Sequence, residues 1–140
     1  MSGAACPLCE GDGGELLWRG ERLRVILAAE VDHPAFLRVV WNAHVREMTD
    51  LPAPRRAELM AAVWAAEMAL REVLNPHKIN LASFGNVVPH LHWHVIARWG
   101  GDPHFPNPVW GMRTGGEVRE LSRAHRESLR LTLARRLEAS

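Results

Sequence analysis

His90-Leu91-His92-Trp93-His94-Val95-Ile96 places a histidine at every second position of an otherwise apolar run. On a β-strand, residues i, i+2 and i+4 share one face, whereas on a helix each two-residue step turns the side chain by ~200°. The spacing therefore predicts a strand over residues 90–99, with three imidazoles on one side. The apolar residues between the histidines would face the core.

Three interpretations of this histidine face compete. It is a solvated polar surface, or a zinc site of a hydrolytic enzyme with His90, His92 and His94 as ligands, or a catalytic site with imidazole as nucleophile. The chain has 8 histidines in all. Three of them at alternate positions make the solvated surface the weakest interpretation, and the other two remain open on spacing alone.

The segments around the histidine run predict an α+β fold. Period-two or apolar patterns predict strands at 15–19, 22–28, 36–41 and 78–84. Apolar residues three and four apart predict a long helix at 55–74, ended by Asn75-Pro76, and a C-terminal helix from about 117 to 137. The proline- and glycine-rich stretch 100–116 is expected to be irregular. This order favours an antiparallel sheet of about five strands with helices on one side.

Length and composition narrow the class of protein. A chain of 140 residues, 47% hydrophobic and 24% charged, is expected to form a single domain spanning 1–140. The net charge of +1 predicts no general attraction to nucleic acid. No apolar run approaches the ~20 residues that a membrane helix needs. The start lacks a signal-peptide pattern and the chain has 2 cysteines, so we expect a reducing, cytoplasmic location and no membrane partner.

Cys6 and Cys9 form a C-x-x-C pair, whose spacing suits a metal site or a redox pair. Two cysteines are half of a metal site at best. Together with the histidine run, Cys6-Pro7-Leu8-Cys9 resembles the histidine triad (HIT) superfamily. The segment from His33 to Val45 and the run Met48-Thr49-Asp50-Leu51 are similar to family segments as well. The resemblance covers about residues 6–99 and leaves 100–140 as an extension. The string Pro89-His90-Leu91-His92-Trp93-His94 and the run 104–110 are similar to a bacterial branch that resembles diadenosine tetraphosphate hydrolase.

The resemblance implies a HIT-like fold and a role for each histidine. His92 would attack the α-phosphorus of a nucleotide and form a covalent nucleotidyl-histidine, His94 would contact the phosphate and leaving group, and His90 would support the site. Asn80 and Asn86 occupy positions where the family has polar residues for ribose and phosphate, although turn chemistry explains Asn86 equally well. Trp110 is the aromatic residue expected nearest to a ligand or partner subunit.

The resemblance also implies a structural zinc ion and a dimer. Relatives that begin with C-x-x-C bind zinc through residues that correspond to Cys6, Cys9, His44 and His90, a closed Cys₂His₂ set. The zinc would not be required for the chemistry. The family usually forms homodimers, and Trp64 and Met68 of the long helix are expected to supply apolar contact surface.

The sequence departs from the family at three places. Phe36 stands where the family has an upstream histidine, 85–89 lacks the usual Gly-Gln-Ser/Thr, and Ala97 replaces a common proline. A non-catalytic nucleotide- or zinc-binding protein is therefore the alternative to a nucleotide hydrolase or transferase. The substrates considered are dinucleoside polyphosphates, nucleoside phosphoramidates and adenylylated leaving groups.

Remaining histidines and tryptophans are expected to be structural. His33 and His77 should lie at the surface in turns, and His125 should be partly buried on the apolar stripe of the last helix. Trp18, Trp41 and Trp64 are expected in the core. The arginines of the last helix are expected to form a solvated face.

Overall fold

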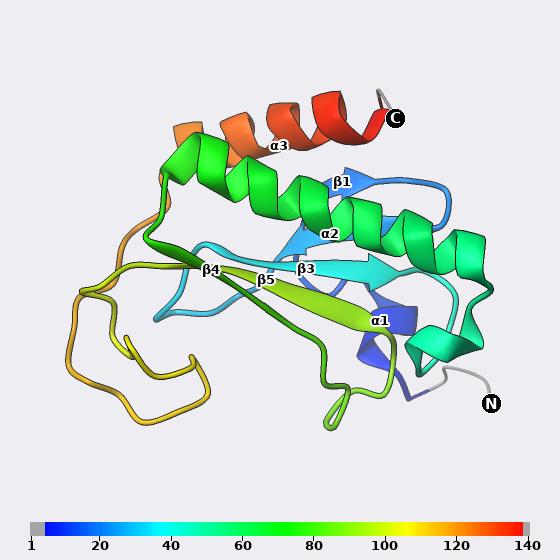
Figure 1. Ribbon diagram of the computed structural model, residues 1–140, viewed down its shortest axis with the longest axis horizontal. Coiled ribbons are helices and arrows are strands. Elements are labelled where there is room, and N and C mark those ends of the chain that lie inside the picture. The colour runs from blue at the N-terminus through cyan, green and yellow to red at the C-terminus, as the bar shows by residue number, and fades with distance from the viewer. Residues whose placement is uncertain (1–4, 139–140) are drawn as a thin grey trace.

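The computed structural model of the protein describes residues 5–138. Five antiparallel strands form one sheet in the order β1-β2-β3-β5-β4 (Figure 1). The strands are β1 (Glu15–Arg19), β2 (Leu23–Leu27), β3 (Phe36–Trp41), β4 (Lys78–Ala82) and β5 (His92–Arg98). The helices are α1 (Pro7–Glu10), η1 (Met48–Asp50), α2 (Ala53–Leu74) and α3 (Arg123–Glu138). These elements confirm the predicted α+β fold with five antiparallel strands.

Different elements pack against the two faces of the sheet. Helices α2 and α3 lie side by side over one face (Figure 1), and the main core lies between them and residues such as Leu37, Val39 and Val95. On the other face, α1 packs through Leu8 against Ile26 and Val40. The segment 100–116 reaches the same face through Val109. The predicted alternation is confirmed for the part of the run that lies in β5: His92 and His94 occupy this second face, and Trp93 and Val95 pack in the main core. His90 precedes the strand.

The C-terminal helix begins later than predicted, at Arg123 instead of Glu117. Gly116 lies against the backbone of Gly101 and Asp102, so close that a Cβ atom would come within 2.2 Å of the Gly101 oxygen. The Glu117 N–H also donates to that oxygen at 2.8 Å. These contacts hold Gly116 and Glu117 outside the helix. The Ser122 hydroxyl accepts from the His125 N–H at 3.0 Å and caps the helix.

Two further expectations about elements are corrected. Strand β5 begins at His92 and not at His90, since the His90 N–H bonds the Val88 carbonyl in a turn at 2.8 Å. Trp64 is 49% exposed on α2 and does not belong to the core, whereas Trp41 is buried and Trp18 packs against the core as expected. Among residues 5–138, no helix is long and apolar enough to span a membrane.

Candidate active site and metal centre

A cavity of about 510 Å³ opens on the sheet face that carries the histidines. Strand residues form its floor, and the N-terminal segment, the loop 84–88 and the segment 100–116 form its walls. Its lining comprises Pro7, Leu8, Gly13, Arg38, Phe84, Gly85, Asn86, Val87, Val88, His92, His94 and Trp110. The volume is within the range of small-molecule sites, so the cavity can take a ligand of nucleotide size.

His92 lines this cavity, and one of its ring nitrogens holds the side chain in position. Its Nδ1–H donates to the backbone carbonyl of His90 at 2.5 Å. With the proton on Nδ1, Nε2 keeps a free lone pair. Burial lowers the pKa of His92, and the charge of Arg38 adds to the effect. A neutral imidazole with a fixed second nitrogen is equipped for nucleophilic attack.

His94 lies next to His92 on the same face. The two ring centroids are 5.0 Å apart, at an interplanar angle of 85°. Burial lowers the pKa of His94 to about 3, with further contributions from His92 and Arg38. His94 is therefore neutral near pH 7. A neutral imidazole can donate a hydrogen bond to a ligand oxygen from whichever nitrogen carries its proton.

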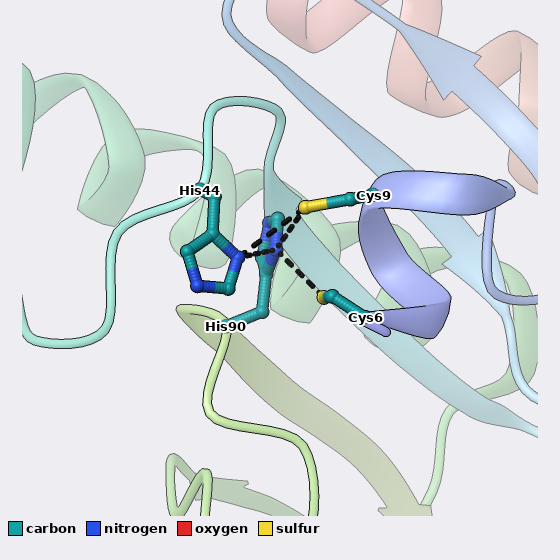
Figure 2. Close-up of side chains that lie close together, drawn as sticks. All are labelled: Cys6, Cys9, His44 and His90. Carbon is teal, nitrogen blue, oxygen red and sulfur yellow. Dashed lines mark hydrogen bonds between the residues drawn. The ribbon is translucent and has the colours of Figure 1, made fainter. Parts of the chain in front are cut away.

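His90 turns away from the cavity and contributes its ring to a second cluster. The ring is fully buried, and its Nε2–H donates to the Trp41 carbonyl at 2.6 Å. Its Nδ1 then carries a lone pair, which faces Cys6 Sγ at 3.3 Å and Cys9 Sγ at 3.4 Å. Figure 2 shows the two cysteines reaching this nitrogen, Cys9 from α1 and Cys6 from the position just before it. The hydrogen bond to Trp41 therefore selects the tautomer that a metal ligand needs.

His44 completes the cluster from the loop after β3. Its Nδ1 lies 3.2 Å from His90 Nδ1 and 3.3 Å from Cys9 Sγ (Figure 2). The four ligand atoms all lie within 4.8 Å of one another. Bonds of about 2.0–2.3 Å in a tetrahedron place neighbouring ligand atoms roughly 3.3–3.8 Å apart. The donor set and its spacing are compatible with a tetrahedral zinc ion.

Buried Arg24 holds the cysteine-bearing segment against the sheet. From β2, its guanidinium donates to the carbonyls of Leu8 at 2.7 Å, Gly11 at 3.1 Å and Asp12 at 3.0 Å. These contacts satisfy carbonyl groups at the end of the short helix α1. Burial raises the pKa of the Cys9 thiol, as does Cys6, and the charge of Arg24 opposes that rise.

A family model of the HIT domain matches residues 14–101. The chain belongs to the HIT family. The resemblance found in the histidine run is thus confirmed over more than half of the chain.

Individual HIT relatives agree with this assignment. AP-4-A phosphorylase from Mycobacterium tuberculosis is 32% identical over 113 residues, which is 76% of this chain but only 58% of the relative. A histidine triad protein from Bradyrhizobium japonicum superposes with a TM-score of 0.72 at 28% identity, covering 90% of this chain and 92% of that chain. A Zn-bound histidine triad family protein from Mycobacterium smegmatis has a TM-score of 0.70, covering 99% of this chain and 100% of that one. At 24% identity, this last similarity shows the fold alone.

The structure brings most of the HIT residues predicted from sequence to these two sites. His92, His94, Asn86 and Trp110 line the cavity, and Cys6, Cys9, His44 and His90 form the Cys/His cluster. Asn80 does not line the cavity. It lies on β4, and its Oδ1 accepts a hydrogen bond from buried Arg98 at 2.8 Å. Because Arg98 also donates to the Asn107 carbonyl, Asn80 helps to position the 100–116 segment.

Phe36, which the resemblance aligns with an upstream histidine of the family, belongs to an aromatic wall beside His94. Its buried ring meets His94 edge-on, with centroids 5.3 Å apart. The ring centroid of Trp110 lies 5.1 Å from that of His94 and 5.0 Å from that of Phe84. Trp110 and Phe84 are both exposed. They offer flat apolar surface at the mouth of the cavity, where a nucleobase can stack.

His33 is buried and not at the surface as predicted. Its Nε2 lies 2.8 Å from Nδ1 of His104, and both side chains are buried. His104 belongs to the irregular 100–116 segment, so no pattern in the sequence indicated that it lies next to His33. His77 is exposed, as predicted, and accepts a hydrogen bond from the Gly100 N–H at 2.7 Å. His125 is partly buried, as predicted.

Sequence reasoning missed two charged residues that shape the site. Arg38 lines the cavity. It is the single charged residue in the otherwise apolar β3, and this isolated charge could have indicated a site residue from the sequence. Asp102 accepts hydrogen bonds from Arg98 Nε at 2.8 Å and from the backbone N–H groups of Trp99, His104 and Phe105. Burial opposes ionisation of Asp102, yet these bonds together lower its pKa. No sequence pattern pointed to Asp102.

Proposed function

We propose that this HIT protein is a nucleotide hydrolase or nucleotidyltransferase that acts through a covalent intermediate on His92. The observation that carries the proposal is the hydrogen bond from His92 Nδ1 to the His90 carbonyl at 2.5 Å. That bond leaves the Nε2 lone pair directed away from the carbonyl, on a residue that lines a cavity of nucleotide size. The HIT family assignment and a curated relative named AP-4-A phosphorylase support a nucleotide as the substrate.

The proposed reaction has two steps. Nε2 of His92 attacks the α-phosphorus, a P–N bond forms, and the P–O bond to the leaving group breaks, with its electron pair going to the leaving oxygen. His94 donates a hydrogen bond where that negative charge grows. Water then attacks phosphorus, the P–N bond breaks with its electron pair returning to His92, and the water proton goes to solvent. Inorganic phosphate in place of water would yield a nucleoside diphosphate.

A substrate screen with intact-mass measurement tests the proposal. Wild-type protein is incubated with diadenosine tetraphosphate, an adenosine phosphoramidate and an adenylylated amino acid, with water or inorganic phosphate as acceptor. We expect turnover of at least one substrate and a nucleotidyl adduct on His92. His92→Ala should abolish both, while exposed His77→Ala should change neither. Unchanged turnover in His92→Ala would refute the covalent mechanism.

One observation favours a second function, that of a nucleotide-binding protein without catalysis. Phe36 fills the position of a family histidine with a ring that has no polar atom, so one contact to the reacting phosphate is missing. Nucleotide binding with no turnover of any substrate would support this second function.

We further propose that Cys6, Cys9, His44 and His90 hold a structural zinc ion. The Cys₂His₂ donor set, the tautomer of His90 and a Zn-bound structural neighbour support it. Zinc there would tie the N-terminal segment to the turn before β5. The catalytic steps proposed above do not use it.

We also propose a C₂ homodimer, in which the exposed side chains of Trp64 and Met68 on α2 contribute to the contact. They are 49% and 43% exposed. Burying such apolar side chains favours association. Light scattering should give twice the chain mass, and Trp64→Glu should shift the protein to the monomer. A monomeric wild type at working concentration would contradict the proposal.

A further inference from the structure

Arg38 lies where a charged ligand group would have to be neutralised. On β3 it pairs in register with His94 of β5, and its side chain lines the cavity. Within the described part of the chain, it is the only Lys or Arg of that lining. Among residues 5–138, the carboxylate that pairs with it is that of Glu30, which is 3.7 Å away and about half exposed, so the ion pair is weak. The guanidinium therefore has hydrogen-bonding capacity left for a ligand.

The apolar surroundings of Arg38 make its positive charge important for binding an anionic ligand. Phe36 lies under its guanidinium, with Cζ 5.3 Å from the ring centroid. Phe84, Val87, Val88 and Trp110 make much of the remaining lining apolar. An anionic phosphoryl group costs much free energy in such surroundings unless it is paired with a charge. A guanidinium suits two phosphoryl oxygens because its parallel N–H groups form a planar fork.

Arg38 also determines the form of its neighbour His94. Its Nε–H donates to His94 Nδ1 at 3.4 Å. A nitrogen that accepts a hydrogen bond carries no proton, so the ring proton of neutral His94 is on Nε2. His94 is thereby set as a donor from Nε2.

We propose that Arg38 has two roles in this site: it binds the non-bridging oxygens of the substrate phosphoryl group, and it fixes His94 as an Nε2–H donor. The inference rests on the proposed nucleotide function. It gives Arg38 the polar contact to the phosphoryl group that the apolar ring of Phe36 cannot make. It identifies the bound group as a phosphoryl group held by a guanidinium in a largely apolar cavity.

Calorimetric binding of AMP and adenosine tests the first role. In Arg38→Gln, AMP affinity should fall about 10- to 100-fold, as expected for loss of a charge-assisted pair. Adenosine affinity should not change, since adenosine has no phosphoryl group. Arg123→Gln, a change on exposed α3 surface, is the matched control and should leave both affinities unchanged. Equal AMP affinity in wild type and Arg38→Gln would overturn the inference.

Arg38→Lys separates the two roles. It keeps the charge but loses the Nε–H and the planar fork, so AMP affinity should fall only a few-fold. The kcat should fall about 10-fold or more, since His94 is free to change tautomer. Nitrogen NMR of ring-labelled histidines gives a reading independent of activity: His94 Nδ1 should be unprotonated in wild type. A proton on Nδ1 there would overturn the positioning role.

These outcomes separate this inference from the proposed function. Failure of the wild type to bind AMP would refute the proposed function and this inference with it. Normal AMP binding in a folded Arg38→Gln variant would refute only the inference. Thermal unfolding near the wild-type Tm establishes that each variant is folded. If Arg38→Gln does not fold, the Arg38→Lys affinity and the NMR result decide the inference.

Discussion

The Nε2 atom of His90 lies 2.6 Å from the backbone carbonyl oxygen of Trp41. This hydrogen bond directs the other ring nitrogen of His90 to the two cysteines. The backbone carbonyl of the same residue accepts the hydrogen bond from Nδ1 of His92, the proposed nucleophile. His90 thus connects the Cys/His cluster to the cavity through one residue. A change in the cluster is expected to reach His92 through the position of that carbonyl.

Removal of both thiols should abolish zinc binding. We expect zinc in the purified wild type and none in Cys6→Ser/Cys9→Ser, because two of four ligands are lost, together with a lower Tm. Metal analysis and thermal unfolding are the measurements, with His77→Gln as the control. If zinc stays bound without the cysteines, His90, His92 and His94 are the metal site and the Cys₂His₂ proposal is wrong.

Asp102→Asn should strongly destabilise the protein. Asp102 and Arg98 are 3% and 2% exposed and lie 2.8 Å apart. Removing the carboxylate charge leaves a buried guanidinium without its partner, which typically costs about 3–5 kcal/mol. Denaturant unfolding measures the change. Asp12→Asn breaks an exposed pair with Arg19 and should cost about 0–1 kcal/mol. Similar values for the two variants would contradict the structural role of Asp102.

The free energy of unfolding should fall as pH drops below the ordinary histidine pKa of about 6.5. In the folded protein, the pKa of His94 is about 3. Between these values the unfolded chain binds a proton that the folded chain does not. The contribution of His94 to the free energy of unfolding is thus full above pH 6.5. It decreases by up to about 1.4 kcal/mol per pH unit down to about pH 3.

Denaturant unfolding between pH 7.5 and 4.5 measures that slope. His94→Gln should reduce it by up to about 1.4 kcal/mol per pH unit, whereas exposed His77→Gln should leave it as in wild type. Burial also lowers the pKa values of His33, His90 and His92, so part of the slope should remain. An identical slope in His94→Gln would show that other groups cause the acid sensitivity.

Trp110→Ala should weaken binding of AMP and adenosine alike. The indole borders the cavity at its mouth and is 53% exposed, so it can stack on a nucleobase. Loss of base stacking typically costs about 1–3 kcal/mol. Calorimetry with both ligands is the measurement, and Trp110→Phe should retain part of the affinity. Met112→Ala, a change at an 81% exposed site in the same segment, is the control. Loss of AMP binding alone would assign Trp110 to the phosphate.

Much of the sheet could be predicted because the strands carry local patterns. The alternation in β5 indicated both its strand character and which side chains share a face. The apolar stripe of α2 placed that helix within two residues of its observed start. The start of α3 was wrong because the contact of Gly116 with Gly101 is tertiary. Trp64 was misplaced because α2 also presents apolar side chains away from the core.

The candidate site could be predicted only where a motif named its residues. The histidine run and the C-x-x-C pair pointed to His92, His94 and the residues of the Cys/His cluster through the resemblance. Arg38 was missed because its role depends on the register between β3 and β5. His33 was placed at the surface because its partner His104 is 71 positions away in the chain.

By itself, the sequence determined the alternation of histidines and apolar residues, and with it the strand, its two faces and the family. This was possible because side-chain direction in a strand depends only on position along the chain. Tertiary structure alone decided which nitrogen of each imidazole is free, through the carbonyls of Trp41 and His90 and the guanidinium of Arg38. It also brought Trp110 over His94 and Cys6 to His90, which is 84 positions away. Such contacts depend on strand register and loop path, which are set by the packing of the whole chain and not by any local pattern.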